Sequence, residues 1–520
     1  MREEPGSGSL TLTFRRLLCA LLWTILLLPG LSCYSKPDAN TLVMLIESSP
    51  TNLDPRIGID GQSENIDNLI FDDLLTKGDD LKPAPGLAER WDIPDPLTFI
   101  FHLHRGAKFH DGRPLMSRDV KWTFDSLLQG KIRSTKAAVY KFVDHIDAPD
   151  DATVVFHMKE PDATLLWNLS DGAIGIVPYG SGDEITLHPI GSGPFKFVSA
   201  ETDREVVLER NDDYWGEKAK LRRVRFAVVP DETTEALELR KGSGDIAINS
   251  LTPDTVVTLA RNPNLAVDTG GGTRLAYLGF NLRDPILKDV RVRQAIAYAL
   301  DRKPMIEYLW RGEAQPARSV LPVQSWAYNG DVPPYLRDPE KAKQLLDAAG
   351  YRAVNGVRFH ITMKTSTDAN TRLMVAVMQQ QLRDVGIALD IRSFEFATFF
   401  SDVQHGAFQM YGLRWIGGNE DPDIFEYAFH SSKFPPNGAN RDYYFNPKVD
   451  ALIDKARREI DPKLRKPLYA EVQQILADDL PYINLWYLDN VLVHTKRVQG
   501  IKLNAAGNYD FLRTAEIVSQ

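Results

Sequence analysis

Residues 415–425, which read WIGGNEDPDIF and which we call the acidic turn, combine flat rings, glycines and acids in one short segment. Carboxylates on a tight turn beside an aromatic ring can bind a metal cation, an amine or a sugar. The same residues also suit an ordinary surface turn, in which Asp421 caps the chain ahead of Pro422. The candidate ligand-binding residues of the acidic turn are Trp415, Gly417, Gly418, Asn419, Glu420 and Asp421.

Three histidines lie close together in the stretch FHLHRGAKFHD, residues 101–111. His102 and His104 are two residues apart, so a strand would present both on one face, with His110 nearby. A His-x-His pair can bind zinc, copper or nickel. Histidines that are exposed or hydrogen-bonded within the fold are the commoner case, and we therefore predict no metal site and no cofactor.

Signatures of hydrolytic and phosphate-binding sites are missing from the sequence. It contains neither G-x-S-x-G nor H-E-x-x-H. The segment 191–194 (GSGP) lacks the Walker spacing and its Lys-Ser/Thr pair, so we predict a turn. Arg291, Arg293 and Asp301 flank a predicted helix and are interpreted as part of its capping. The sequence thus predicts a protein that is not an enzyme; a secreted hydrolase, with a triad assembled from distant residues, is the alternative from a different class.

Strand-like and helix-like segments alternate around these residues. Strands are predicted at 98–104, 275–282 and 481–495, where aromatic and β-branched residues dominate. Helices are predicted where an Asx cap precedes apolar residues at helical spacing. The predicted caps are Asp289, Asn446 and Asp461. This mixture predicts an α/β protein.

Length and charge narrow the class further. The chain has 520 residues, a formal net charge of -9 and 43% hydrophobic residues, which suits a globular protein of two or three domains. A mildly acidic balance without a Lys/Arg-rich tract gives no electrostatic footprint for nucleic acid. We therefore expect no nucleic-acid partner.

The first 33 residues resemble an export signal. Arg15 and Arg16 precede an apolar run from 17 to 28, which is too short to span a membrane and suits a signal peptide. The sequence has two cysteines, Cys19 and Cys33, both in this leader, so we expect no disulfide framework. Cys33 follows a small residue, as in bacterial lipoprotein sites, although Gly30 replaces the usual Leu. Lipidation of Cys33 and ordinary signal cleavage with an unmodified Cys33 are both open.

Ten stretches, taken in order, resemble one protein family: the dipeptide/oligopeptide/nickel-binding solute-binding proteins of ABC importers (family 5, cluster C type). Their order and spacing carry the resemblance, which runs from about residue 40 to 512. The stretches are LDPR (53–56), NLIFDDLL (68–75), APGLAERW (84–91), FHLHRGAKFHDGRPLMSRDVKWTF (101–124), PIGSGPFKF (189–197), NDDYWG (211–216), YLGFNLRDPILKDVRVRQAIAYALDR (277–302), AAGY (348–351), YFNPKVDALI (444–453) and LPYINLWY (480–487).

The resemblance implies a two-lobed periplasmic-binding-protein fold with a hinge and an extra domain inserted in the first lobe. Two crossing segments, near 275 and near 490, would form the hinge, and ligand would favour the closed state. The implied divisions are a signal peptide of lipoprotein type (1–33), lobe I part a (40–75), the inserted domain (76–180), lobe I part b (181–275), lobe II (276–490) and the C-terminal return to lobe I (491–515).

The resemblance also implies which residues would contact ligand. Peptide-binding relatives read W-x-x-D here, and that Asp holds the ligand's free amino group; the matching position in this chain is Gly418. Asn419 or Glu420 could replace the missing acid, or the ligand could lack a free amine. The other implied contacts are the rings of Trp415, Tyr277 and Tyr487, and the backbone at Ile59 and Gly61.

We therefore expect an extracytoplasmic binding protein that captures a peptide-like solute between two lobes and delivers it to an ABC transporter. An oligosaccharide, another amine-free solute or a metal chelate is the alternative ligand. The expected partners are the solute and the permease and ATPase of the transporter. The expected protein is a monomer in the periplasm or cell envelope, attached to the membrane only through lipidated Cys33.

Overall fold

The computed structural model describes residues 40–78, 80–171, 174–417 and 420–518. Strands and helices alternate through these residues, which confirms the predicted α/β class. The predicted signal peptide, Cys33, Gly418 and Asn419 lie outside the described residues. Among the described residues, no helix is both long enough and apolar enough to span a membrane.

A mixed sheet of eleven strands organises the described chain, in the order β15-β14-β16-β12-β17-β11-β1-β10-β9-β8, with β13 paired to β17. The bounds are β1 (Thr41–Ile46), β8 (Phe195–Glu201), β9 (Glu205–Arg210), β10 (Arg223–Val228), β11 (Ile246–Ile248), β12 (Leu265–Phe280), β13 (Ala314–Pro316), β14 (Phe359–Ser366), β15 (Ile387–Phe394), β16 (Met410–Trp415) and β17 (Tyr482–Thr495). The predicted strands at 275–282 and 481–495 are therefore confirmed as parts of β12 and β17.

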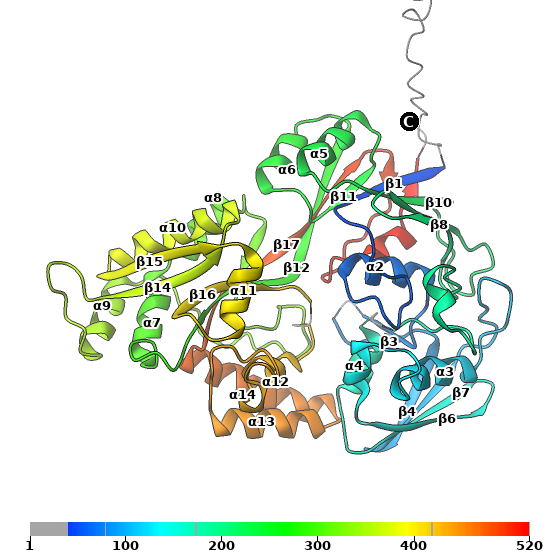
Figure 1. The fold of residues 1–520 in the computed structure, drawn as a ribbon, viewed down its shortest axis with the longest axis horizontal. Helices are drawn as coiled ribbons and strands as arrows, with labels where there is room; N and C mark the ends of the chain where they lie inside the picture. Colours follow the sequence, from blue (N-terminus) through cyan, green and yellow to red (C-terminus); the bar gives the residue numbers. More distant parts are fainter. Residues whose placement is uncertain (1–39, 79, 172–173, 418–419, 519–520) are drawn as a thin grey trace, which may run out of the picture. The chain divides into compact units, whose positions relative to one another are not determined.

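The antiparallel strands β12 and β17 are the longest of this sheet and run side by side through its middle (Figure 1). Their register is continuous up to the pair Gly270–Asn490 and resumes, shifted, at the pair Arg274–Leu488. Glycines at 270–272 suit such an irregularity because they tolerate close backbone approach. The shift lies beside the two positions, near 275 and near 490, where the sequence predicts a hinge; the hinge motion stays a prediction.

A second, four-stranded sheet has the order β4-β5-β7-β6. Its strands are β4 (Ala88–Asp95), β5 (Thr98–Leu103), β6 (Val143–Asp150) and β7 (Thr153–Met158). The alternation predicted at 98–104 is confirmed, because Phe99, Phe101 and Leu103 are buried on the face that packs against helix α3. Small two-stranded sheets are formed by β2 (Leu75–Lys77) with β3 (Pro83–Pro85) and by β18 (Val498–Gln499) with β19 (Glu516–Ile517).

Helices cover the sheets and begin at local sequence signals. Asp289, Asn446 and Asp461 each accept a hydrogen bond from a backbone N–H of the following turn, which confirms the predicted starts of α7, α13 and α14. The helices are α2 (Gly61–Ile70), α3 (Ser117–Leu128), α4 (Leu165–Ser170), α5 (Glu232–Lys241), α6 (Pro253–Leu259), α7 (Val290–Ala299), α8 (Arg302–Leu309), α9 (Pro339–Ala348), α10 (Ala369–Arg383), α11 (Phe396–Gln404), α12 (Ile424–Phe429), α13 (Pro447–Arg458) and α14 (Pro462–Asp479), with 3-10 turns η1 (Thr135–Tyr140), η2 (Asp183–Thr186), η3 (Ser431–Lys433) and η4 (Tyr509–Arg513).

Separate apolar cores form on the two sides of the β12–β17 register shift. One core contains Leu42, Phe226 and Leu512, which come from both ends and the middle of the described chain. Another contains Phe280 and Trp486 and is built from residues 276–488. This division by sequence follows the two predicted lobes, whose exact bounds stay a prediction.

Most of the buried apolar residues described in the segment 76–180 belong to a cluster that extends beyond this segment. Phe101 and Phe156 belong to the same buried cluster as Tyr277 and Phe425. The link includes the rings of Trp167 and Trp326, whose centroids are 5.5 Å apart. Packing therefore joins this segment to residues that the sequence assigns to lobe II.

Candidate functional site

The acidic turn follows the last residue of β16, Trp415. Gly417 has a φ of +70°, a left-handed conformation that glycine adopts without steric cost, and its position has open space where a side chain would be. Glu420 and Asp421 then lead into α12.

Glu420 holds a cation, and that cation is the ammonium group of Lys77. The two side chains form an ion pair, and Thr273 donates a hydrogen bond of 3.0 Å to the other carboxylate oxygen of Glu420. Lys77 also contacts Asp171. Burial alone would lower the pKa of the Lys77 ammonium, but the carboxylates of Asp171 and Glu420 raise it well above its ordinary value. The acidic turn thus binds an amine that belongs to the protein itself.

The Asp421 side chain caps the acidic turn through a hydrogen bond from the backbone. One of its oxygens accepts a 2.7 Å hydrogen bond from the backbone N–H of Asp423, which is the geometry of an Asx turn ahead of α12. Burial raises the pKa of this carboxyl to about 7, and the Arg465 guanidinium opposes the shift. Its second oxygen has no hydrogen-bond partner among the described residues. This geometry favours the turn-cap interpretation of Asp421 over a direct role in ligand binding.

Trp415 and Tyr277 form a ring pair next to the acidic turn. The rings are nearly parallel, at an interplanar angle of 16°, with centroids 6.1 Å apart. Trp415 is partly exposed, its indole N–H has no partner among the described residues, and the Arg441 guanidinium lies 5.5 Å from its centroid. The indole nitrogen is itself buried, so what the partly exposed ring offers a ligand is its aromatic surface.

Tyr277 and Tyr487 lie deeper than a ligand-contacting ring would. Tyr277 is 1% exposed and stacks on Tyr482 with centroids 4.2 Å apart. Tyr487 is also buried, and its hydroxyl is within hydrogen-bonding reach of the carbonyl oxygens of Ser319 and Leu321. Both rings support the site from within the core, and their direct contact with ligand stays a prediction that this geometry does not favour.

Ile59 and Gly61 flank the start of α2. The Ile59 side chain is 62% exposed, which is unusual for a large apolar residue. Gly61 is the first residue of α2, and Asp60 caps the helix by accepting a 2.9 Å hydrogen bond from the Ser63 N–H. Their role in contacting an extended ligand stays a prediction.

Lys77, Thr273 and Arg441 are site residues that the sequence did not single out. Lys77 lies 343 residues before Glu420 and is the last residue of the short strand β2. The one local signal was the glycine run at 270–272, which immediately precedes Thr273. No spacing rule connects such distant residues.

The three histidines of the stretch 101–111 make contacts within the fold. His102 contacts Asp92 at 2.9 Å, and the His104 ring packs on Trp215. Burial lowers the pKa of His110 to about 4, and its ring lies 3.1 Å from the Gly193 carbonyl oxygen. Within the described residues these three imidazoles share no set of metal-ligand atoms.

Two other predicted structural features are confirmed. At 191–194 the chain turns against α2, where the Gly193 N–H donates to the Ile70 carbonyl. Arg291 pairs with Asp289 at 2.6 Å. The guanidinium of Arg293 binds backbone carbonyls, including that of Leu480 at 3.0 Å. Asp301 precedes α8 at the cap position, but its side chain makes no capping hydrogen bond there, so the capping interpretation is not confirmed for this residue.

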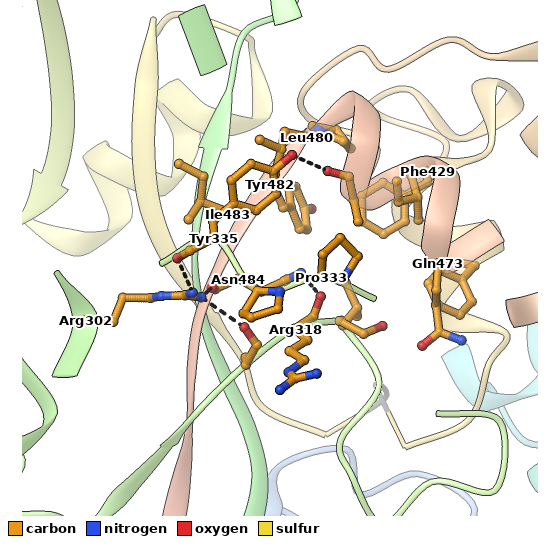
Figure 2. Close-up of a pocket in the computed structure, with 18 residues that line it drawn as sticks. Arg302, Arg318, Pro333, Tyr335, Phe429, Gln473, Leu480, Tyr482, Ile483 and Asn484 are labelled. Atoms are coloured by element: carbon orange, nitrogen blue, oxygen red, sulfur yellow. Dashed lines mark hydrogen bonds between the residues drawn. The ribbon is translucent and has the colours of Figure 1, made fainter. Parts of the chain in front are cut away.

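A small, partly open pocket lies between α12, α14, β17 and the segment 317–335 (Figure 2). Its volume of about 40 Å³ has room for a few water molecules and excludes a peptide or sugar. Arg302 at its edge donates to the Tyr335 carbonyl at 2.7 Å and to the Ala317 carbonyl at 3.0 Å (Figure 2). This pocket is therefore too small to be the solute site.

Comparison with known proteins identifies a family and several proteins that this chain resembles. Residues 82–436 match the family described as "Bacterial extracellular solute-binding proteins, family 5 Middle". The dipeptide-binding protein of Escherichia coli is 27% identical over 91% of this chain and 94% of that protein. Heme-binding protein A of Haemophilus influenzae is 28% identical over 89% of each chain. The periplasmic binding protein DppA of Helicobacter pylori, solved in complex with peptide STSA, is similar at a TM-score of 0.73 and 28% identity, over 92% of this chain and 98% of that one.

These matches cover nearly the whole described chain, and they confirm the two-lobed α/β fold that the sequence motifs predict. The ring pair and the acidic turn thus lie in a scaffold that is used to bind solutes outside the cytoplasm. The chain belongs to the bacterial extracellular solute-binding proteins of family 5.

Proposed function

We propose that this protein captures a peptide-like solute between its two lobes and delivers it to an ABC importer. The dipeptide-binding relative and the STSA complex of the similar structure support peptide as the solute class. The observation that carries the proposal is the Lys77–Glu420 ion pair in the acidic turn. This pair links segments that are distant in sequence, and the turn that carries Glu420 also carries the partly exposed Trp415 ring, as expected where two lobes meet around a ligand.

We assign the lobes as the sequence does: the first to 40–75, 181–275 and 491–515, the inserted domain to 76–180, and the second to 276–490. The separate apolar cores on the two sides of the β12–β17 register shift support this division. Lys77 then belongs to the inserted domain and Glu420 to the second lobe. Their ion pair would favour the closed state.

The site expected for the solute's amino group differs from that of peptide-binding relatives. Gly418 provides no carboxylate where peptide-binding relatives have Asp, and the Glu420 carboxylate already binds Lys77. A peptide amine therefore has to displace Lys77 from Glu420, or the amine contributes little to binding. A solute without an amine is the second candidate, and the heme-binding relative supports a broader solute range in this family.

Native mass spectrometry tests the solute class. The protein is purified without refolding, its intact mass is measured, and any solute released on denaturation is identified. A set of peptide masses supports the proposal, whereas a sugar, a heme or a chelate supports the amine-free alternative. If the protein is recovered empty, thermal-shift assays with peptides and sugars side by side decide between the two classes.

The remaining properties are inferred from family and sequence together. We infer that the protein returns its solute chemically unchanged, acts as a monomer outside the cytoplasm, and is attached to the membrane through lipidated Cys33. Recovery of unaltered solute after long incubation tests the absence of catalysis. The mass of the N-terminal peptide from membrane fractions, compared with that of a Cys33→Ser variant, tests lipidation, and light scattering tests the monomer.

A further inference from the structure

Three potential metal ligands converge on the four-stranded sheet, away from the acidic turn. The side chains of His145 and Asp147 on β6 and His157 on β7 bring their ligand atoms within 4.8 Å of one another. Nε2 of His157 lies 3.3 Å from the Asp147 carboxylate, and Nε2 of His145 lies 3.8 Å from it. Two donors bound to one tetrahedral zinc ion at ordinary bond lengths are separated by about 3.3–3.5 Å. The observed separations are therefore close to those of a bound state.

The sheet geometry explains why these residues meet. His145 and His157 are directly opposite each other on the antiparallel pair β6–β7. An irregularity between Val143 and His145 shifts the alternation of β6, so that His145 and Asp147 share the exposed face while Val143 and Ile146 are buried. The two imidazole rings stack at 4.3 Å and 12°. Binding one ion requires these exposed rings to rotate toward each other, which the open face permits.

A fourth residue orients the cluster. Nδ1 of His145 lies 2.8 Å from the Asp144 carboxylate. Because a carboxylate can only accept, Nδ1 carries the proton and Nε2 keeps its lone pair toward Asp147 and His157. A carboxylate behind a ligating histidine is the usual support of zinc-binding imidazoles. The carboxylates of Asp144 and Asp147 beside the two imidazoles also place negative charge where a divalent cation would bind.

We propose that His145, Asp147 and His157 bind one divalent transition-metal ion of the zinc class, with Asp144 orienting His145 and water completing the coordination. Two imidazoles and one carboxylate suit zinc, and nickel or copper would compete for the same donors. The side chains are between 34% and 57% exposed, so the ion can enter directly from solvent. This site lies on the face opposite the one packed against α3 and is independent of solute capture.

Titration of the full-length protein with zinc chloride, followed by calorimetry, tests the proposal. We expect one zinc ion per chain with an affinity in the micromolar range, and at least tenfold weaker binding in the His157→Ala and Asp147→Asn variants. His102→Ala is the matched control, because His102 lies on the same sheet face, one strand from His157, but contacts Asp92 instead. All samples carry the same two cysteines, so differences between them report on the substituted residue.

Cobalt(II) provides a second measurement on the same proteins. The native protein and the His102→Ala variant should show the visible absorption of cobalt bound to nitrogen and oxygen ligands, and the His157→Ala variant should lose it. Circular dichroism checks that each variant is folded. Zinc binding that is absent in the native protein, equal in the native protein and the His157→Ala variant, or lost equally in the His102→Ala control would overturn the proposal.

Discussion

Lys77 and Glu420 form an ion pair although 343 residues separate them in the chain. Both side chains are largely shielded from water, with 19% and 9% of their surface exposed. Thr273 holds the second oxygen of Glu420, so the carboxylate is fixed from two directions. An ion pair in such surroundings is costly to break by removing one partner, because the other charge is left without compensation.

The Lys77→Met substitution should weaken solute binding. If the pair stabilises the closed state, its loss raises the dissociation constant by roughly tenfold, or about 1.4 kcal/mol. Isothermal titration with the solute identified by mass spectrometry measures this change, and the Lys77→Met/Glu420→Gln double mutant gives the coupling energy.

The Lys82→Met variant is the control for Lys77, because Lys82 lies in the same segment and pairs with Asp80 on the surface. Exposed pairs contribute little, so this variant should bind solute like the native protein. A Lys77→Met variant that binds solute more tightly would contradict our account and would indicate that Lys77 competes with the solute's amine for Glu420.

Trp415→Ala should mainly weaken solute binding, whereas Tyr277→Ala should mainly lower the free energy of unfolding. Trp415 is partly exposed, so its truncation should weaken solute binding at least tenfold and cost about 1–2 kcal/mol of unfolding free energy. Tyr277 is buried against Tyr482, so its truncation should cost about 3–5 kcal/mol. Urea denaturation and calorimetry on both variants make the comparison. If Trp415→Ala unfolds the protein, Trp415 is a core residue and not a ligand contact.

Tyr487→Phe should lower stability without affecting solute binding. The hydroxyl is buried and is satisfied by backbone carbonyls at 319 and 321, so its removal leaves acceptors unpaired and should cost about 1–2 kcal/mol. The unfolding midpoint in urea and the solute affinity are measured on the same preparation. A loss of affinity with unchanged stability would instead place this hydroxyl in contact with solute.

Asp421→Asn should change how stability depends on pH. The pKa of the Asp421 carboxyl is raised from 3.8 to about 7 by burial, so the folded protein keeps a proton that the unfolded chain has lost. The contribution of the protonated Asp421 carboxyl to the free energy of unfolding is fully present below about pH 4. It is lost as the pH rises to about 7. The native protein should therefore lose about 1–3 kcal/mol relative to the variant over this range.

Urea unfolding at pH 4.5, 6 and 7.5 measures that difference. Asp80→Asn is the control, because the hydrogen bond from Lys82 lowers the pKa of the Asp80 carboxyl. A lowered pKa contributes stability that is complete above about pH 4, so the native–variant difference for Asp80 should stay constant from pH 5 to 7.5. A constant difference for Asp421 as well would mean that its carboxyl ionises normally in the folded protein.

Local features of the fold could be predicted from the sequence. The caps Asp289, Asn446 and Asp461 act within one helical turn, so their residue types alone indicate where α7, α13 and α14 begin. The alternation in β5 reflects one buried and one solvated face, which a two-residue period detects. In each case the interacting atoms are close in sequence.

The site could be predicted only in part. β17 is buried on both faces, so its sequence has no alternation to indicate that Tyr487 points into the core. The partner of Glu420 depends on the packing of the whole chain, which brings Lys77 to it from another segment. His145 and Asp147 share a strand face through their two-residue spacing, but the pairing of His145 with His157 depends on the register of β6 against β7, which residue types do not indicate. Long-range packing and strand register are thus what the sequence pattern could not supply.

The core that contains Leu42, Phe226 and Leu512 joins residues from both ends of the described chain, which has a consequence for biosynthesis. β1, near the start of the described chain, pairs with β10 and β11, and β11 in turn pairs with β17. The Arg497 guanidinium donates to the Thr41 carbonyl, 456 residues away. Contacts of such high sequence separation form late, because the intervening chain must first be available. The core that contains Leu42, Phe226 and Leu512 therefore cannot close before β17 and the residues after it have been synthesised.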